Sequence, residues 1–211
     1  MRTTAINQVL QEMLSTPRLE KYLVARGGDL HQALSLYEWN TRLSEAFYTP
    51  LQCMEICLRN KLSDQLSAAY GVDWLVSQTI PLENDAREQI ESAMRDIETR
   101  GKTLTSGAVV AELSFGFWVA LLGPRYDATL WRKALYLVFL ENGKRIRRDR
   151  VHGRLNALRR FRNRIAHHEP IFLSNLPNTH REIIETTNWM CSVTAAWSVH
   201  QSRFQVIFDA G

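Results

Sequence analysis

The sequence predicts an all-α protein, and three observations carry this prediction. Apolar residues recur at the three- and four-residue spacing of amphipathic helices, and no stretch alternates convincingly with a period of two. Glycine (10) and proline (6) are scarce among the 211 residues, which disfavours a fold with many tight turns. Hydrophobic residues make up 45% and charged residues 23%, which is ordinary for a soluble globular protein and excludes disorder as the default.

Breaking residues divide the N-terminal part of the chain. A first helix is expected over 4–14, and Pro17 suits the first turn of a short second helix. The glycines at 27–28 end this pair of helices. We therefore interpret residues 1–28 as an N-terminal helical extension and 29–208 as the main bundle of a single domain.

The central part of the chain shows the strongest helical pattern. A long helix is expected from residue 30 to about 70, capped by Asp29, and Pro50 is expected to kink or restart it. Two short apolar helices are expected to break at Gly116. The helices predicted after the long one span 82–100, 106–113, 115–122 and 126–140, and a turn follows at 142–143.

The helix expected over 147–168 is the most informative for function. Its buried stripe is predicted to be Val151, Leu155, Leu158, Phe161 and Ile165. Pro170 requires that this helix end near residue 168. A loop over 171–179 and a last helix over 180–208, with Trp197 among its inward residues, complete the prediction.

The sequence gives no sign of a membrane span, a secretory signal or a metal site. No apolar run reaches about 18 residues, and the N-terminus lacks an apolar core, so we expect a cytoplasmic protein without membrane contact. Cys53, Cys57 and Cys191 have no framework spacing and are interpreted as reduced thiols, the first two sharing one helix face. Structural zinc normally takes four ligands, so no metal or other cofactor is expected.

Positive charge is concentrated in one segment. Residues 144–168 hold ten Lys or Arg and one acid, whereas the remainder holds 16 basic and 21 acidic residues. The segment thus carries +9 and the rest of the chain −5. This asymmetry predicts a polyanionic partner such as RNA, which the arginine-rich segment would attract.

Arg162, Asn163 and His167 are the candidate catalytic residues. RNA can be cut without a metal when the ribose 2′-OH attacks the adjacent phosphate, which requires a base, an acid and a group that stabilises the developing negative charge. Histidine can give or take a proton near neutral pH, and a guanidinium can stabilise the transition state through two hydrogen bonds. The amide of Asn163 can orient either partner.

Four blocks of sequence resemble one known family. The run 162–172 (RNRIAHHEPIF) contains an arginine, a following polar residue and a histidine five positions on, and resembles the RX4-6H signature of the HEPN superfamily. Together with 55–62 (EICLRNKL), 70–75 (YGVDWL) and 113–118 (LSFGFW), it resembles the Abi-like (abortive infection) family within that superfamily, in consistent order over roughly 17–205.

The resemblance implies a HEPN-like helical bundle, here with additional N-terminal and central helices. It also implies a frequent homodimer, metal-independent RNA cleavage, and a role in phage defence or toxin-like growth arrest. A possible antitoxin or regulatory protein is a further implied partner. The candidate substrate-binding residues are Arg59, Arg159, Arg164 and His168, and Glu55 is a candidate supporting residue.

Helical geometry leaves the assembly of the site open. At 100° per residue, Asn163 and His167 lie 40° apart around a regular helix, whereas Arg162 and His167 lie about 140° apart. The length of the arginine side chain could close part of this gap. Alternatively, two chains could complete the site across a two-fold axis.

Structural roles for the same residues are also consistent with the sequence. Arg162 could pair with a carboxylate such as Glu55, and Glu55 could pair with Arg59 one turn away. His168 could be the working histidine or a helix C-cap. At the level of function, the alternatives are a non-catalytic RNA-binding module and a protein-interaction bundle.

Overall fold

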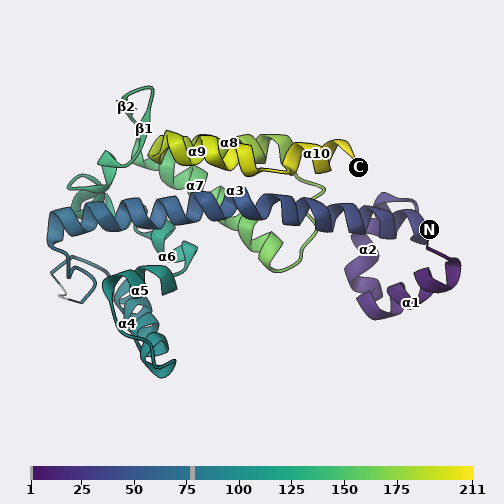
Figure 1. Ribbon diagram of the computed structural model, residues 1–211, viewed down its shortest axis with the longest axis horizontal. Coiled ribbons are helices and arrows are strands. Elements are labelled where there is room, and N and C mark those ends of the chain that lie inside the picture. The colour runs from purple at the N-terminus through teal and green to yellow at the C-terminus, as the bar shows by residue number, and fades with distance from the viewer. Residues whose placement is uncertain (1, 77–78) are drawn as a thin grey trace.

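The computed structural model describes residues 2–76 and 79–211 and is built around one long helix, α3 (Leu30–Tyr70). At 1.5 Å per residue, its 41 residues extend about 60 Å. The other helices pack along α3 or at its two ends (Figure 1). The expected all-α class is confirmed.

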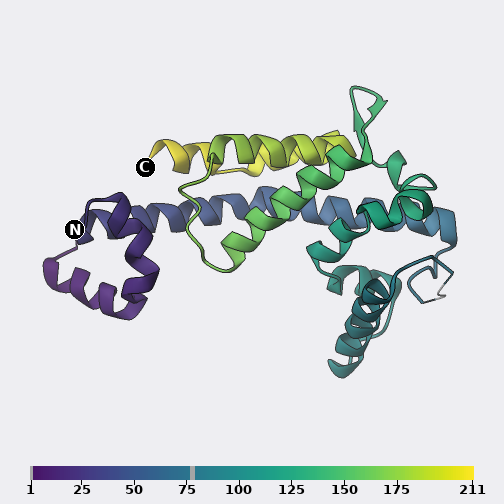
Figure 2. The ribbon, with the colours of Figure 1, turned by 180° about the vertical axis from the view of Figure 1, so that it is seen from behind.

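The N-terminal helices α1 (Thr4–Leu14) and α2 (Thr16–Ala25) fold against the start of α3 (Figures 1 and 2). Asp29 caps α3 as predicted, because its side chain accepts a hydrogen bond from the Gln32 backbone N–H. A small core of its own, formed by Leu19, Tyr22, Ala33, Leu34 and Leu36, holds this end of the molecule together.

Of the two outcomes predicted for Pro50, a restart of the helix was wrong. The helix continues through this residue, whose ring is buried. Proline removes one hydrogen bond of the helix ladder, a loss that usually costs about 3 kcal/mol. Burial of α3 residues on both sides of Pro50, including Phe47, Leu51 and Met54, offsets that loss.

The helices α4 (Asn84–Thr99), α5 (Ser106–Glu112) and α6 (Phe115–Ala120) follow, and α4 and α5 lie at the far end of α3 (Figure 2). The break before α6 falls at Ser114, not at Gly116 as predicted. The Ser114 side chain accepts a hydrogen bond from the Phe117 backbone N–H and so caps α6, whereas Gly116 lies within the helix.

The single helix predicted over 126–140 was also wrong. Three short helical turns replace it, over Pro124–Tyr126, Asp127–Trp131 and Leu135–Leu137. A small antiparallel hairpin of β1 (Leu140–Glu141) and β2 (Lys144–Arg145) follows. Asn142 and Gly143 form its turn with positive φ angles of 50° and 75°, as a two-residue hairpin requires.

Helix α7 (Arg148–Ala166) lies close to its predicted position, and its stripe is buried except for the half-buried Ile165. The predicted last helix is instead three helices, α8 (Leu176–Met190), α9 (Ser192–Gln201) and α10 (Phe204–Asp209). Extended backbone at Cys191 and Ser202 separates them. This division leaves Trp197 56% exposed, contrary to its predicted burial.

The three cysteines are free thiols, and Cys53 and Cys57 are buried as expected. Within the described part of the chain, no helix combines the length and the apolar character needed to cross a bilayer.

Candidate functional site

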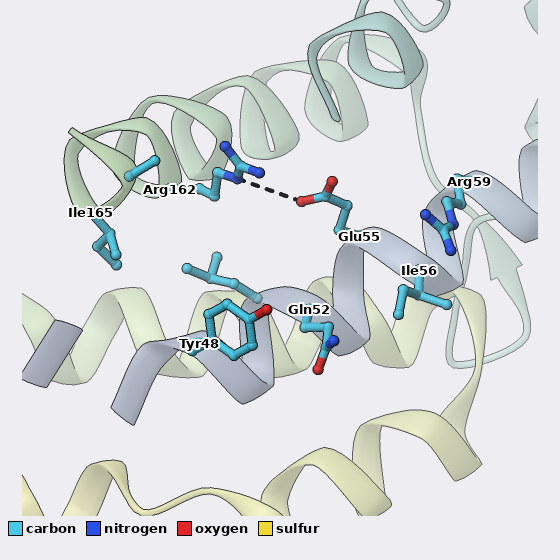
Figure 3. A pocket seen from close by; sticks show the side chains of 9 residues that line it. Tyr48, Gln52, Glu55, Ile56, Arg59, Arg162 and Ile165 are labelled. Carbon is cyan, nitrogen blue, oxygen red and sulfur yellow. Dashed lines mark ion pairs between the residues drawn. The ribbon is translucent and has the colours of Figure 1, made fainter. Parts of the chain in front are cut away.

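A hollow of about 390 Å³ lies between the middle of α3 and the C-terminal end of α7 (Figure 3). Nine described residues line it: Tyr48, Leu51, Gln52, Glu55, Ile56 and Arg59 from α3, and Arg162, Ile165 and Ala166 from α7. Three of the predicted site residues, Glu55, Arg59 and Arg162, therefore meet in one place although about 100 residues separate the two segments.

Arg162 points across this hollow toward Glu55 (Figure 3). Its Nε lies 3.6 Å from Oε2 of Glu55, so the ion pair that the sequence left open is formed. The Arg162 side chain is nevertheless 41% exposed. The pair thus positions the guanidinium at the wall of the hollow and leaves it within reach of an anion.

Arg59 supplies the second guanidinium of the hollow. It does not form the ion pair with Glu55 that was considered from the sequence; its Nη1 lies 3.4 Å from the carbonyl oxygen of Ala111, at the long limit of a hydrogen bond. Its buried Nε has no hydrogen-bond partner among the described residues. Arg59 therefore retains unused donor capacity beside the hollow.

The turn after α7 places His167 and His168 at the surface. His167 is the C-cap, and the His168 N–H donates to the carbonyl of Ile165 over 3.0 Å while the Glu169 N–H donates to that of Arg164 over 2.8 Å. These two bonds define a Schellman motif, whose C′ residue has a left-handed backbone. His168 occupies that position with φ 57°, where glycine is usual. The cap residue is therefore His167, His168 is the C′ residue that follows it, and the choice of the working histidine stays a prediction.

His167 and Asn163 are not among the residues that line the hollow. Both belong to the last turn of α7, His167 as an exposed residue and Asn163 as a half-buried one. Within one chain the structure therefore assembles Arg162 with Glu55 and Arg59, and leaves the histidine beside this cluster. The angular separation expected from the helix is the reason.

Buried contacts hold the turn after α7 in place. Asn40 of α3 is 5% exposed, and its Oδ1 accepts hydrogen bonds from the backbone N–H groups of Ile171 (2.7 Å) and Phe172 (3.1 Å). From α2, Arg18 donates to the His168 carbonyl over 2.9 Å. The sequence analysis missed Asn40; its only signal there was a polar residue on the buried side of a helix.

Two predicted substrate-binding residues have contacts within the chain. Arg164 donates to the carbonyl of Pro170 and to the Ser174 hydroxyl, so it closes the loop after α7. Arg159 donates through Nε and Nη2 to Oδ1 of Asn156 on the same helix. These contacts give Arg164 a structural role and leave the substrate-binding role of both arginines a prediction.

Most of the arginines in the basic segment form ion pairs in the folded protein. Their carboxylate partners come largely from other parts of the chain: Asp149 for Arg147, Asp127 for Arg148, Glu141 for Arg150, Glu182 and Glu185 for Arg154, and Glu169 for Arg164. Arg160 is exposed and has no ion pair among the described residues. The segment is therefore far less cationic in space than in sequence.

Two histidines away from the hollow have lowered pKa values. Burial lowers the pKa of His180, whose ring stacks on Phe204 at 4.5 Å between centroids. Burial, followed by the charges of Arg148 and Arg159, lowers the pKa of His152. The described residues contain no group of three His, Cys, Asp or Glu side chains arranged to hold a metal ion.

The fold and the site define an all-helical protein with an open, arginine-lined hollow beside a histidine-bearing helix end. The model of the Abi-like protein family matches residues 8–173, well over half of the chain. The chain belongs to the Abi-like protein family, as predicted, and this membership associates it with abortive infection. No curated protein and no solved structure matches it.

Proposed function

We propose that this protein is a metal-independent endoribonuclease acting in abortive infection or a toxin–antitoxin type system. The observation that carries the proposal is the solvent-open pair of Arg162 and Arg59 in the hollow, next to the exposed His167 at the fixed end of α7. Phosphate and guanidinium are complementary in charge and geometry, and histidine supplies proton transfer near neutral pH. The family membership is consistent with both.

In the proposed reaction the ribose 2′-OH attacks the adjacent phosphorus, and the bond to the 5′ oxygen of the next nucleotide breaks. His167 acts as the base or the acid. Arg162, positioned by Glu55, stabilises the negative charge of the phosphorane-like transition state. Asn163 orients one of these groups. The products are a 2′,3′-cyclic phosphate and a 5′-OH.

We further propose that a homodimer completes the site. His167 does not line the hollow of its own chain, and a two-fold axis near the end of α7 would bring the histidine of one copy to the arginine of the other. The expected partners are therefore RNA and a second copy of the chain. We also propose an antitoxin or regulatory protein as a partner of the chain.

The test is cleavage of a labelled RNA pool in EDTA by wild type, Arg162→Ala and His167→Ala. We expect the wild type to release 5′-OH ends and each variant to be slower by at least about 100-fold. Replacement of the exposed His200 by alanine is the matched control and should leave cleavage unchanged. Circular dichroism and a thermal melt show that each variant is folded.

Mixing the two inactive variants tests the shared site. If each site takes Arg162 from one chain and His167 from the other, random re-pairing restores about a quarter of wild-type activity. Wild type that binds RNA with a steep salt dependence but never cuts it would favour the RNA-binding module. Absence of RNA binding at low salt would favour the protein-interaction bundle.

A further inference from the structure

Tyr48 separates two hollows on the exposed side of α3. It lines the hollow that contains Arg162 and also a second hollow, of about 260 Å³, between α3 and the segment around α10. Among the described residues it is the only one that lines both. Figure 3 shows its ring at the edge of the first hollow, on the side opposite Arg59.

The Tyr48 side chain has the properties of a stacking surface. It is 65% exposed, although it lies in the middle of the longest helix of the protein. The backbone beneath it is therefore rigid while the ring remains open to solvent. Tyrosine has two side-chain torsions, so ordering it against a ligand costs little conformational entropy.

The two hollows have the same balance of charge. The first contains Arg59, Arg162 and Glu55. The second contains Arg42, Arg203 and Glu45, of which Arg203 and Glu45 are 3.7 Å apart and both at least 70% exposed. Each hollow thus carries a net charge of +1, and the aromatic ring lies between them.

We propose that Tyr48 is a nucleobase-stacking residue, and that a single strand of RNA crosses α3 there with phosphates in both hollows. The proposal rests on the proposed function and extends it by a second phosphate site and a base site. Arginine-lined grooves that alternate with exposed aromatic rings are typical of single-stranded nucleic acid binding. From Arg42 to Arg59, α3 rises about 25 Å, enough for several nucleotides.

The charges favour RNA over a protein partner at this position. The buried centre of a protein–protein interface is depleted of aspartate, glutamate and lysine, although arginine is enriched there. Tyr48 is instead flanked on both sides by charged side chains, including both members of the Arg203–Glu45 pair. A second copy of the chain packed on Tyr48 would have to cover these charges.

The experiment measures equilibrium binding of two short, labelled, fully 2′-O-methylated oligonucleotides that cannot be cut because they lack the attacking hydroxyl. One carries its bases, and the other is abasic over its central positions. We expect Tyr48→Ala to weaken binding of the base-bearing strand by about ten-fold, or about 1.4 kcal/mol, and to leave the abasic strand unchanged. Tyr48→Phe, which retains the ring, should bind both strands as the wild type does.

Two further variants sharpen the result. Trp197→Ala removes another aromatic side chain, which is 56% exposed on α9 and lies outside both hollows. It should leave the affinities for the base-bearing and the abasic strand unchanged. Arg203→Gln should weaken the binding of both strands equally. It should also reduce the slope of log affinity against log salt concentration by about 0.7, the value of one phosphate contact on a single strand.

Other outcomes overturn the proposal. Equal losses on both strands, or no loss on either, would exclude base stacking at Tyr48. A change of oligomeric mass in Tyr48→Ala, measured by light scattering, together with equal losses on both strands would assign the residue to a protein interface. If the wild type binds neither strand, the RNA partner of the proposed function fails as well; if it binds and Tyr48→Ala matches it, only the present proposal fails.

Discussion

The two halves of α7 use the same residue type in different ways. In the N-terminal half, Arg148, Arg150 and Arg154 each contact carboxylates contributed by other elements. In the C-terminal half, Arg164 also pairs with Glu169, but Arg160 is exposed without an ion pair in the described structure. Arg162 shares the single carboxylate of the hollow, Glu55, with Arg59 of α3. The first group joins α7 to its neighbours, and the second retains charge that a ligand can use.

This difference shows how a charged run in sequence becomes a charged surface in space. The count of ten basic residues and one acid over 144–168 suggested a continuous cationic face. Folding brings acids from residues 127, 141, 182 and 185 onto α7 and neutralises its first half. What remains is a local site at the C-terminal end, which is also where His167 lies.

Replacing one arginine from each half tests the comparison most directly. Arg148 donates to the carbonyl of Leu122 over 3.1 Å and contacts Asp127, and its side chain is 19% exposed. We expect Arg148→Met to lower the free energy of unfolding by about 1–3 kcal/mol, because it removes a charged donor from a buried acceptor. Arg160→Met should change it by less than about 0.5 kcal/mol.

Urea unfolding followed by circular dichroism measures both values. Arg132 remains as a partner of Asp127 in the Arg148 variant, so the loss is not inflated by an orphaned carboxylate. The affinity of Arg148→Met for RNA should equal that of the wild type. Equal destabilisation by the two substitutions would remove the distinction between the halves of α7.

The long, periodic elements were predictable from the sequence because local signals determine them. The helix at 30–70, the Asp29 cap and the position of α7 follow from apolar spacing, capping chemistry and Pro170. The segment at 126–140 was not predictable in this way. Leu130, Leu135 and Phe139 are fully buried, whereas Leu137 and Leu140 are 39% and 42% exposed, so the apolar residues of the segment form no one-sided stripe that would indicate where a helix begins or ends.

The candidate site was predictable only in part. The motif at Arg162 and His167 and the helix bearing Glu55 and Arg59 were found from residues that lie close together in sequence. Their meeting in one hollow and the anchor at Asn40 depend on contacts between segments more than 100 residues apart. The position of Tyr48 between the two hollows depends on its exposure in the folded protein. A single sequence contains no local signal for either property.

A second prediction concerns the strained turn that ends the C-terminal half of α7. His168 adopts φ 57°, a backbone conformation that costs a residue with a Cβ about 1 kcal/mol relative to glycine. We expect His168→Gly to raise the free energy of unfolding by roughly that amount, while cleavage of RNA is retained. Thermal melts and the EDTA cleavage assay measure the two properties.

Glycine at an exposed helical position provides the control for this substitution. Ala196→Gly on α9 should lower the free energy of unfolding by about 1 kcal/mol, the usual helix penalty of glycine. A loss of cleavage in a stable His168→Gly protein would transfer the proton-transfer role from His167 to His168, and so would revise the assignment at this end of α7.

The smallest expected effect is a change in how stability depends on pH, which a buried histidine causes and an exposed histidine does not. The pKa of His180 is lowered from 6.5 by burial, so the folded protein binds less proton than the unfolded chain when the pH lies between the two values. The stability contributed by the neutral ring is therefore present above about pH 6.5 and is lost as the pH falls through the lowered folded-state pKa. His152, with its pKa lowered in the same direction, adds to this acid sensitivity.

His180→Phe keeps an aromatic ring against Phe204 and removes the titrating group, although it also removes the 2.9 Å hydrogen bond to Ser202. We expect the difference in melting temperature between pH 7.5 and pH 5.5 to be smaller in this variant than in the wild type. His200→Phe, at an exposed position on α9, should retain the wild-type difference. If acid still abolishes RNA cleavage in a His180→Phe protein that remains folded, the acid-sensitive step belongs to the chemistry at the end of α7 and not to the stability of the bundle.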